Sequence, residues 1–261
     1  MTRTAVVTPV ANDARGMPKL IVIIPALNEE GAIGAVVRKV KRVLPDTPVL
    51  VIDDHSTDRT ARIAGDAGAD VVRLHTHLGV GGCVRTGYQI AFERGYEQVI
   101  RIDGDGQHEA RDIPRILGAL ASSGADVVIG SRFIPPGEWQ SSFARSLGIA
   151  LFRRLLAPVL GKAILDPTSG FIGINRQALA VFAHRLPHVY PEIGGLILLR
   201  RNRLRFHEVP CRMYPRRTGK SSFTFLNSFH YTTHVLAGIL VNALRAEIPL
   251  KGAGRHGFES E

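Results

Sequence analysis

The stretch VIRIDGDGQH, residues 99–108, joins a short apolar segment to two carboxylates. Its first residues are rich in β-branched side chains, which is typical of a buried strand. Asp103 and Asp105 follow, and in extended backbone the Asp-x-Asp spacing places both side chains on one face. Gly104 and Gly106 let the chain bend and a ligand approach closely. These two acids suit a divalent cation shared with phosphates, although acids and glycines after a strand also form ordinary solvated turns.

Apolar segments of strand length alternate with helical patterns on both sides of this stretch. Strands are predicted at 19–25, 49–52, 71–74, 98–102 and 126–130, and helices at 33–44, 57–67, 83–94 and 112–122, with a turn at Gly79, Gly81 and Gly82. This alternation predicts a parallel, doubly wound sheet covered on both faces. After the turn at 166–171 a further strand is expected to add antiparallel at the sheet edge, and 204–213 is predicted as another strand.

Polar side chains follow three of the predicted strands directly. They are Asn28 and Glu29, Asp53 and Asp54, and Asp103 and Asp105. Ligands of doubly wound sheets bind at the carboxyl ends of the strands, so three such ends together favour a polar ligand site over three independent helix caps. The glycine fingerprints of dinucleotide-binding and P-loop proteins are absent from the sequence.

Composition and charge narrow the class of protein. The 261 residues are 45% hydrophobic and carry a formal net charge of +10, which fits a globular protein with a sizeable core. Eight basic residues and one acid lie between Arg200 and Lys220, and such a run points to an anionic partner. Cys83 and Cys211 are too few for a disulfide framework, so a reducing, cytoplasmic setting is expected. The apolar run 235–244 is too short to span a bilayer, which takes about 20 residues.

Seven segments resemble the family-2 glycosyltransferases of the GT-A fold, in particular the dolichyl- and polyprenyl-phosphate sugar transferases. The segments are PALNEE at 25–30, VIDDHSTDRT at 51–60, VRTGYQIAFERGY at 84–96, IDGDGQH at 102–108, GSRF at 130–133, DPTSGF at 166–171 and RRTGKSSF at 216–223. The resemblance implies an α/β fold with a Rossmann-like, mostly parallel mixed sheet and a C-terminal amphipathic helical extension. It implies a disordered leader at 1–18, the GT-A domain at 19–215, a basic loop and amphipathic interfacial helix at 216–247, and a flexible tail at 248–261.

The resemblance also implies roles for individual residues. Asp103, Asp105 and Gln107 correspond to the set that holds Mg²⁺ or Mn²⁺ on the donor diphosphate. The nucleotide-binding positions correspond to Pro25, Leu27, Glu29, Ile52, Asp54 and Gly104. The phosphate- and acceptor-binding positions correspond to Arg132, Arg145, Arg216, Arg217, Ser221 and Ser222, and the catalytic set to Asp103, Asp105, Arg145 and Arg216. Two positions depart from the pattern: Leu27 stands where an aromatic residue is frequent, and Lys220 precedes by two residues the position where some relatives carry lysine.

The expected reaction is an inverting transfer of a hexose from a GDP-mannose- or UDP-glucose-type donor to a polyprenyl or dolichyl phosphate. Because an acceptor phosphate is already anionic, the arginines are expected to bring two anions together by bidentate contacts. The acceptor lipid is expected along residues 223–244, with the protein peripheral on the cytoplasmic face of a membrane. A small membrane protein or a second copy of the chain is the expected partner, and nucleic acid is not.

Three alternatives stay open at this point. The same fold can act on a soluble small-molecule or sugar acceptor, which requires a general base, and Asp166 or Glu192 is available for that role. The basic run alone also fits a nucleic-acid-binding protein, but it comes without a zinc-finger, RNP or helix-turn-helix pattern. A catalytically inactive scaffold is the third alternative, and the presence of Asp103, Asp105 and Arg132 argues against it.

Overall fold

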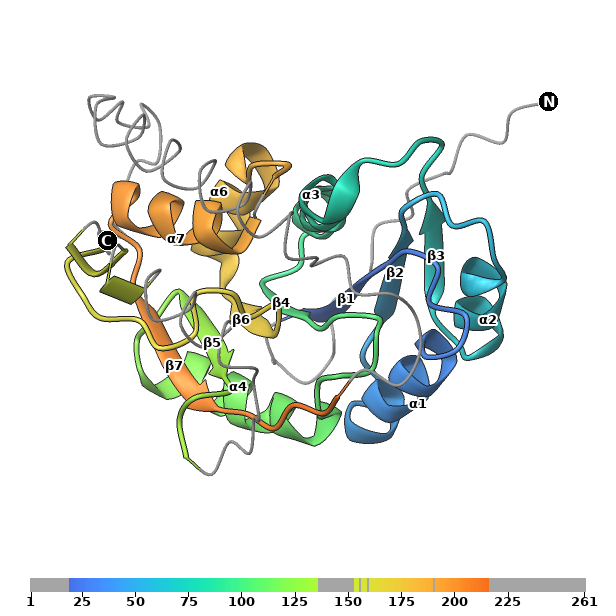
Figure 1. The fold of residues 1–261 in the computed structure, drawn as a ribbon, viewed down its shortest axis with the longest axis horizontal. Helices are drawn as coiled ribbons and strands as arrows, with labels where there is room; N and C mark the ends of the chain where they lie inside the picture. Colours follow the sequence, from blue (N-terminus) through green and yellow to red (C-terminus); the bar gives the residue numbers. More distant parts are fainter. Residues whose placement is uncertain (1–18, 136–152, 155, 159, 190, 216–261) are drawn as a thin grey trace, which may run out of the picture.

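The computed structural model describes residues 19–135, 153–154, 156–158, 160–189 and 191–215. Its centre is a seven-stranded sheet in the order β3-β2-β1-β4-β6-β5-β7 (Figure 1). The strands are β1 (Leu20–Ala26), β2 (Val49–Asp53), β3 (Asp70–Arg73), β4 (Gln98–Arg101), β5 (Val127–Ser131), β6 (Ile172–Ile174) and β7 (Phe206–Pro210). All neighbours pair in parallel except β6, which is antiparallel to both β4 and β5. The expected mostly parallel mixed sheet is confirmed.

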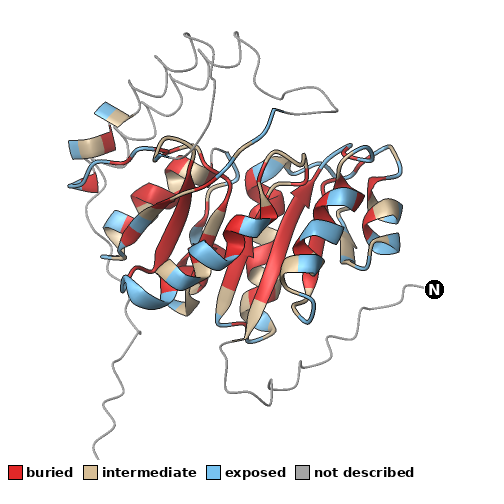
Figure 2. Cartoon of the chain, turned by 90° about the horizontal axis from the view of Figure 1, so that it is seen from below, coloured by how far each residue is buried: buried red, intermediate tan, exposed pale blue. Residues whose placement is uncertain are grey.

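Helices cover both faces of this sheet, as the alternating pattern predicts. One face carries α1 (Ile33–Val43), α2 (Thr60–Asp66), the 3₁₀ turn η1 (Ala110–Asp112) and α4 (Ile113–Ser122), and the other carries α3 (Gly79–Glu93), α6 (Arg176–Arg185) and α7 (Pro191–Arg201). The inner strands β2, β1, β4, β6 and β5 are almost wholly buried (Figure 2). The outer strands β3 and β7 are partly exposed. Each face of the sheet has its own apolar core, which is why the central strands are apolar on both sides.

The position of β6 corrects the sequence prediction. That strand was expected at the sheet edge, but it lies between β4 and β5 and pairs with both. Its sequence IGI is apolar and small enough for this central place, where Ile174 is fully buried. The edge is taken by β7, whose exposed His207 tolerates solvent on one side.

The start of α3 also differs from the prediction. Gly79, Gly81 and Gly82 were expected to form a turn before the helix, but the helix begins at Gly79 and includes the other two. A Cβ atom at Gly81 would lie 2.2 Å from the carbonyl oxygen of His188. The absence of a side chain therefore lets the loop before α7 pack directly on the first turn of α3.

Both cysteines are free and buried. Cys83 lies in α3 and its thiol donates to the carbonyl oxygen of Ile52, 3.2 Å away. Burial raises the pKa of the Cys83 and Cys211 thiols to about 12. Thiolate, the nucleophilic form, is therefore scarce at neutral pH.

We expect Gly173→Val to destabilise the fold by about 2 kcal/mol. A Cβ atom at Gly173, in the middle of β6, would lie 2.5 Å from Cγ2 of Ile116, so a side chain there overpacks the core. The matched control is Gly118→Ala on the exposed side of α4, where nothing lies within 4 Å, and it should stabilise by about 0.5–1 kcal/mol. Urea unfolding of the two variants measures both; equal effects would contradict the central placement of β6.

Candidate active site

The carboxyl ends of β1, β2 and β4 meet at one edge of the sheet. The hydrogen-bond pattern continues past the strands, since the N–H of Asp54 donates to the carbonyl oxygen of Ala26 at 2.9 Å. On the other side of β1, the N–H of Gly104 donates to the carbonyl oxygen of Pro25 at 3.2 Å. The three polar strand ends identified in the sequence therefore lie side by side, which confirms that they share one edge.

The loops after β1 and β2 are fastened to each other by side chains. The N–H of Asn28 donates to Oγ of Ser56, and the N–H of Thr57 donates back to Oδ1 of Asn28. Asn28 and His55 both have left-handed backbone, with φ of 52° and 64°. Such conformations cost energy for residues other than glycine, and they are held here by the interlocked loops.

The residues expected to contact the nucleotide are arranged around these loops. Glu29 is buried, and its N–H donates to Oγ1 of Thr60. Asp54 is also buried, accepts from the N–H of Leu78 and contacts Nδ1 of His77 at 2.9 Å. Leu27 is exposed beyond the end of β1.

Pro25 and Ile52 are buried within their strands. The side chain of Ile52 packs toward Gly87 of α3, inside the core and away from solvent. Asp54, which follows β2, thus offers the polar group at this strand end, while the side chain of Ile52 lies in the core beneath it.

The two acids after β4 have different surroundings. Asp103 contacts Nη2 of Arg101 through Oδ1 at 3.2 Å and Nε2 of His108 through Oδ2 at 3.3 Å. Burial by itself would raise the pKa of Asp103, but the charge of Arg101 and the contact with His108 hold it well below its usual value. Asp105 accepts a hydrogen bond from the N–H of Gln107 at 3.0 Å. Asp103 is thus an ionised carboxylate at neutral pH.

Asp103 and Asp105 fit a cation whose remaining coordination positions are filled by a bound ligand. Within the described part of the chain, no group of three or more His, Cys, Asp and Glu side chains is arranged to hold a metal. Mg²⁺ is commonly held by one or two carboxylates together with substrate phosphates, and Asp103 and Asp105 supply that number. Gly170 makes room for Asp103, because a Cβ atom there would lie 2.3 Å from Oδ2 of that residue.

The chain after β7 crosses over the loop that carries Asp105. The N–H of Tyr214 donates to the carbonyl oxygen of Gln107 at 2.7 Å, and Nε2 of Gln107 donates back to the carbonyl oxygen of Tyr214 at 3.1 Å. Residues His108 and Met213 form an isolated antiparallel bridge. The side chain of Gln107, which the sequence predicts to bind metal, therefore hydrogen-bonds residues 211–215 to the acidic loop.

Arg132 and Asp166 form a buried, bidentate ion pair. Nε and Nη2 of Arg132 donate to the two carboxylate oxygens of Asp166 at 2.7 and 2.6 Å. Asp166 is itself fixed by Glu208, whose carboxylate accepts the N–H groups of residues 165 and 166. Arg132 lies just past β5, at the same edge as Asp103. Asp166 thus acts here as the partner that orients Arg132.

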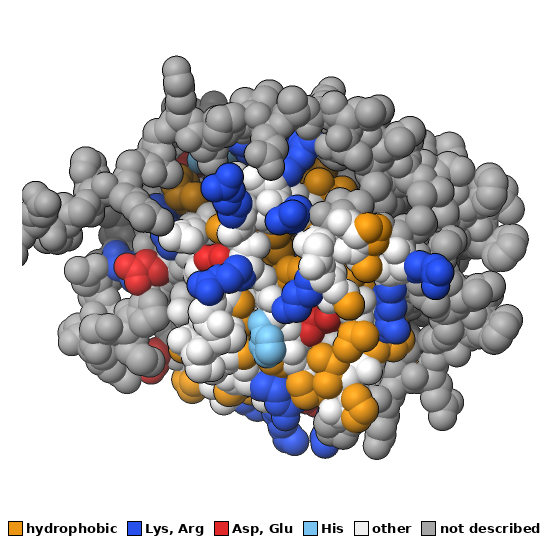
Figure 3. Space-filling view, turned by 90° about the vertical axis from the view of Figure 1, so that its left-hand side faces the viewer, with side chains coloured by type: hydrophobic (Ala, Val, Ile, Leu, Met, Phe, Trp, Pro, Cys, Tyr) orange, Lys and Arg blue, Asp and Glu red, His pale blue; other side chains and the backbone are white. Residues whose placement is uncertain are grey.

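The described part of the basic run, residues 200–215, is not one patch in space. Arg205 lies beside the start of β5, since its carbonyl oxygen accepts the N–H of Val127. Arg212 follows β7 and its N–H donates to Oδ2 of Asp112, at the opposite end of the strand from Arg205. The intervening strand spans about 16 Å. Figure 3 looks at the end of the molecule with α7 and β7 and shows its Lys and Arg side chains scattered among neutral and apolar ones.

Several predictions from the sequence lie outside the described residues. They concern Arg145, Arg216, Arg217, Ser221 and Ser222, the leader at 1–18, the helix at 216–247 and the tail at 248–261. The roles expected for these residues stay predictions.

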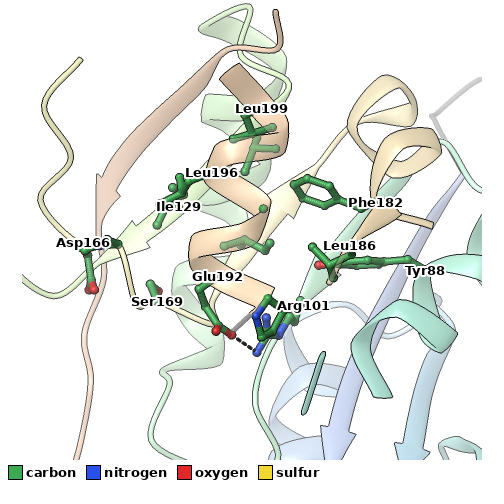
Figure 4. Close-up of a pocket in the computed structure, with 15 residues that line it drawn as sticks. Tyr88, Arg101, Ile129, Asp166, Ser169, Phe182, Leu186, Glu192, Leu196 and Leu199 are labelled. Atoms are coloured by element: carbon green, nitrogen blue, oxygen red, sulfur yellow. Dashed lines mark hydrogen bonds and ion pairs between the residues drawn. The ribbon is translucent and has the colours of Figure 1, made fainter. Parts of the chain in front are cut away.

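A pocket between α7 and the sheet was not foreseen from the sequence. Its polar end is formed by Arg101 and Glu192, which contact each other at 2.8 Å, and Figure 4 shows Glu192 pointing from the first turn of α7 toward Arg101. Its apolar end includes Tyr88, Phe182, Leu196 and Leu199. The arginine inside an otherwise apolar strand, at position 101, was the available signal, because a charge at such a position needs a buried partner.

We expect Asp166→Asn to lower the free energy of unfolding by about 3 kcal/mol, because it leaves the guanidinium of Arg132 buried without its counter-charge. The side chains of this pair are 0% and 10% exposed. The control is Asp66→Asn, which breaks an exposed pair with Arg62 and should change stability by less than about 0.5 kcal/mol. Urea titration of both variants tests this, and a similar small effect at both positions would contradict it.

The sequence of the chain is similar to a known protein family and to named members of it. The family model described as Glycosyl transferase family 2 matches residues 21–182, more than half of the chain. An undecaprenyl-phosphate mannosyltransferase of Micrococcus luteus is 33% identical over 170 residues, covering 62% of this chain and 68% of the relative. A polyprenol monophosphomannose synthase of Mycolicibacterium smegmatis is 33% identical over 175 residues, covering 63% of this chain and 64% of the relative.

Solved structures agree with this match. Glucosyl-3-phosphoglycerate synthase from Mycobacterium tuberculosis, in complex with Mn²⁺, UDP-glucose and phosphoglyceric acid, superposes with a TM-score of 0.67 at 25% identity, covering 92% of this chain and 84% of that one. The complex with Mn²⁺, UDP and glucosyl-3-phosphoglycerate gives 0.65 at 26% identity, with coverages of 86% and 80%. The chain described here therefore belongs to glycosyl transferase family 2 and is a glycosyltransferase with the GT-A fold.

Proposed function

We propose that the protein transfers a hexose from a nucleotide-diphosphate sugar, of the GDP-mannose or UDP-glucose type, to a polyprenyl phosphate, with inversion. An oxygen of the acceptor phosphate forms a bond to the anomeric carbon of the sugar. The bond from that carbon to the β-phosphate oxygen breaks, and the nucleoside diphosphate leaves with the electron pair. Two observations together support the proposal. The chain has two acids at the end of β4, and it is 33% identical to two relatives whose names specify transfer of mannose to a polyprenol phosphate.

The donor is assigned to the ends of β1, β2 and β4. Asp54 and Glu29 would face the nucleoside, with Leu27 and Gly104 beside them. Pro25 and Ile52 would support these residues from within the buried strands. Asp103 and Asp105, with Gln107, would hold Mg²⁺ or Mn²⁺. The cation, when bound, neutralises negative charge that develops on the leaving diphosphate. Its use here is supported by the Mn²⁺ and UDP named in the matched structures.

The acceptor phosphate is assigned to the arginine side of the same edge. Arg132 is held in place by Asp166, so its guanidinium is oriented before the substrate arrives. Arg145, Arg216 or Arg217, Ser221 and Ser222 would add the remaining contacts. Since both substrates are anionic, the work of these groups is to reduce the repulsion between them.

Exposed apolar side chains support a lipid acceptor. Among the described residues, the exposed large apolar side chains are Leu27, Leu78, Val80, Leu165, Val189 and Tyr214, which we call the apolar rim. Each belongs to a segment on the carboxyl side of the sheet: Leu27 follows β1, and Leu78 is tied to Asp54. Single exposed apolar residues are common, but their gathering around one polar site favours a membrane surface over bulk water. No described helix is long and apolar enough to cross a membrane.

A second candidate function is transfer to a small anionic acceptor in solution. It is favoured by the matched glucosyl-3-phosphoglycerate synthase structures, one of which contains phosphoglyceric acid. A soluble acceptor of this kind has no use for the apolar rim.

We expect purified protein to glycosylate a short-chain polyprenyl phosphate from GDP-mannose or UDP-glucose with Mn²⁺ present. Asp105→Asn should lower the rate at least about 100-fold, because charge on the leaving group is no longer balanced. Asp70→Asn, which removes an exposed carboxylate at the start of β3, is the control and should retain full activity. The assay measures radiolabelled sugar in the organic phase.

Transfer that survives both a chelator and Asp105→Asn would contradict the assigned metal site. Transfer to phosphoglycerate without any transfer to the lipid would instead establish the second candidate.

We expect the apolar rim to bind neutral phosphatidylcholine vesicles. Val80 and Val189 are 49% and 63% exposed, and burying both in lipid is worth roughly 1.5 kcal/mol. The double variant Val80→Ser with Val189→Ser should therefore bind about tenfold more weakly in vesicle sedimentation. Ala121→Ser, on the exposed side of α4, is the control. Equal binding by the wild type and the double variant would remove this support for a lipid acceptor.

A further inference from the structure

Arg101 is a buried cation at the end of β4, close to the proposed reaction site. Its side chain is 3% exposed, and its Nη2 atom contacts Oδ1 of Asp103 at 3.2 Å and Oε1 of Glu192 at 2.8 Å. Glu192 belongs to the first turn of α7 and lies 91 residues away in the sequence. One guanidinium therefore joins the acidic loop to the first turn of α7. Figure 4 shows the Glu192 end of this link.

This arrangement is not explained by stability alone. Removing a guanidinium and two carboxylates from water costs several kcal/mol per ion, and well-packed apolar residues often stabilise as much or more. The same pocket is otherwise lined by apolar side chains such as Phe182 and Leu196. An ionic cluster at such a place is more readily explained by its effect on the neighbouring site.

The orientation of Arg101 is set mainly by its two carboxylate partners. Its Nε atom is buried and has no hydrogen-bond partner among the described residues, and the same holds for the hydroxyl of Tyr88. Both groups line the pocket, whose solvent-accessible space of about 30 Å³ has room for about two water molecules. Asp103 and Glu192 thus hold the guanidinium from one end, and a change in either acid would leave it held by the other alone.

We propose that Arg101 is a positioning residue of the transfer reaction. It holds Asp103 at the donor side and, through Glu192, holds the first turn of α7 against the same site. The inference rests on the proposed function, because the reaction provides its kinetic test. Its link to Glu192 is separate from the proposed nucleoside contacts, since Asp54 and Glu29 have their own partners in the loops after β1 and β2.

The same contact bears on the role of Glu192. As the partner of a buried guanidinium, this carboxylate accepts a charge-assisted hydrogen bond from Nη2 of Arg101. In the proposed arrangement Glu192 orients α7 and does not remove a proton from the acceptor.

The test compares Arg101→Met, Arg101→Lys and Glu192→Gln with the control Arg176→Met. Arg176 is a partly buried arginine on α6 that donates to the carbonyl oxygens of Phe92 and Tyr96, away from the site. Three quantities are measured for each folded variant: binding of UDP and GDP with Mn²⁺ by calorimetry, amide hydrogen exchange of residues 191–196, and kcat for sugar transfer.

We expect Arg101→Met and Glu192→Gln to lower kcat about 10–100-fold. In Glu192→Gln, which leaves the contact of Arg101 with Asp103 in place, nucleotide affinity should change less than about threefold. Exchange of residues 191–196 should become faster in both variants and stay unchanged in Arg176→Met. Arg101→Lys should recover part of kcat, because an ammonium keeps the charge but reaches one carboxylate at a time. The double variant should be no worse than the more damaged single variant, as for two members of one cluster.

Loss of nucleotide binding in parallel with kcat in Glu192→Gln, or an equal loss of kcat in Arg176→Met, would overturn the inference. So would unchanged exchange of residues 191–196 in both Arg101→Met and Glu192→Gln. Exchange and nucleotide binding need no acceptor, so they test the positioning role even if the wild type fails to transfer sugar to a polyprenyl phosphate. That failure would count against the proposed function alone.

Discussion

The parallel pairing of β1 with β2 and β4 is the constraint on which the site depends. It brings the ends of three strands to one edge, and the hydrogen bonds of Asp54 to Ala26 and of Gly104 to Pro25 extend the pairing into the loops. A shift of one residue would turn each side chain to the opposite face of the sheet. The acids after β4 therefore owe their common location to backbone geometry.

Charge at this edge is balanced before any substrate binds. Asp103 is paired with Arg101, and Asp166 with Arg132. Such pairs avoid the high cost of isolated buried charges and also fix the directions in which the charged groups point. The proposed reaction brings two anions together, so it benefits from cations whose positions need no rearrangement, and this would be the physical link between the fold and the reaction.

Much of the architecture follows from local patterns. The β-branched run before Asp103 and the helical spacing in 33–43 predict their elements closely, because each buries a face set by its own period. The site edge followed from the same alternation. The place of β6 did not, because a three-residue apolar strand fits either an edge or the centre until β7 competes for the edge. Likewise, the basic run 200–220 is continuous in the sequence, but β7 separates Arg205 at one end of the strand from Arg212 at the other.

The amino-acid sequence by itself determined the fold class, the family and the acidic strand end at Asp103, since these depend on residues close together in the chain. The tertiary structure decided which distant side chains meet. The pairing of Arg101 with Glu192 joins residues 91 apart, and the bidentate contact of Arg132 with Asp166 joins residues 34 apart. Neither spacing leaves a periodic pattern, because such contacts form only when packing of α7 and the loops brings the partners within hydrogen-bond distance.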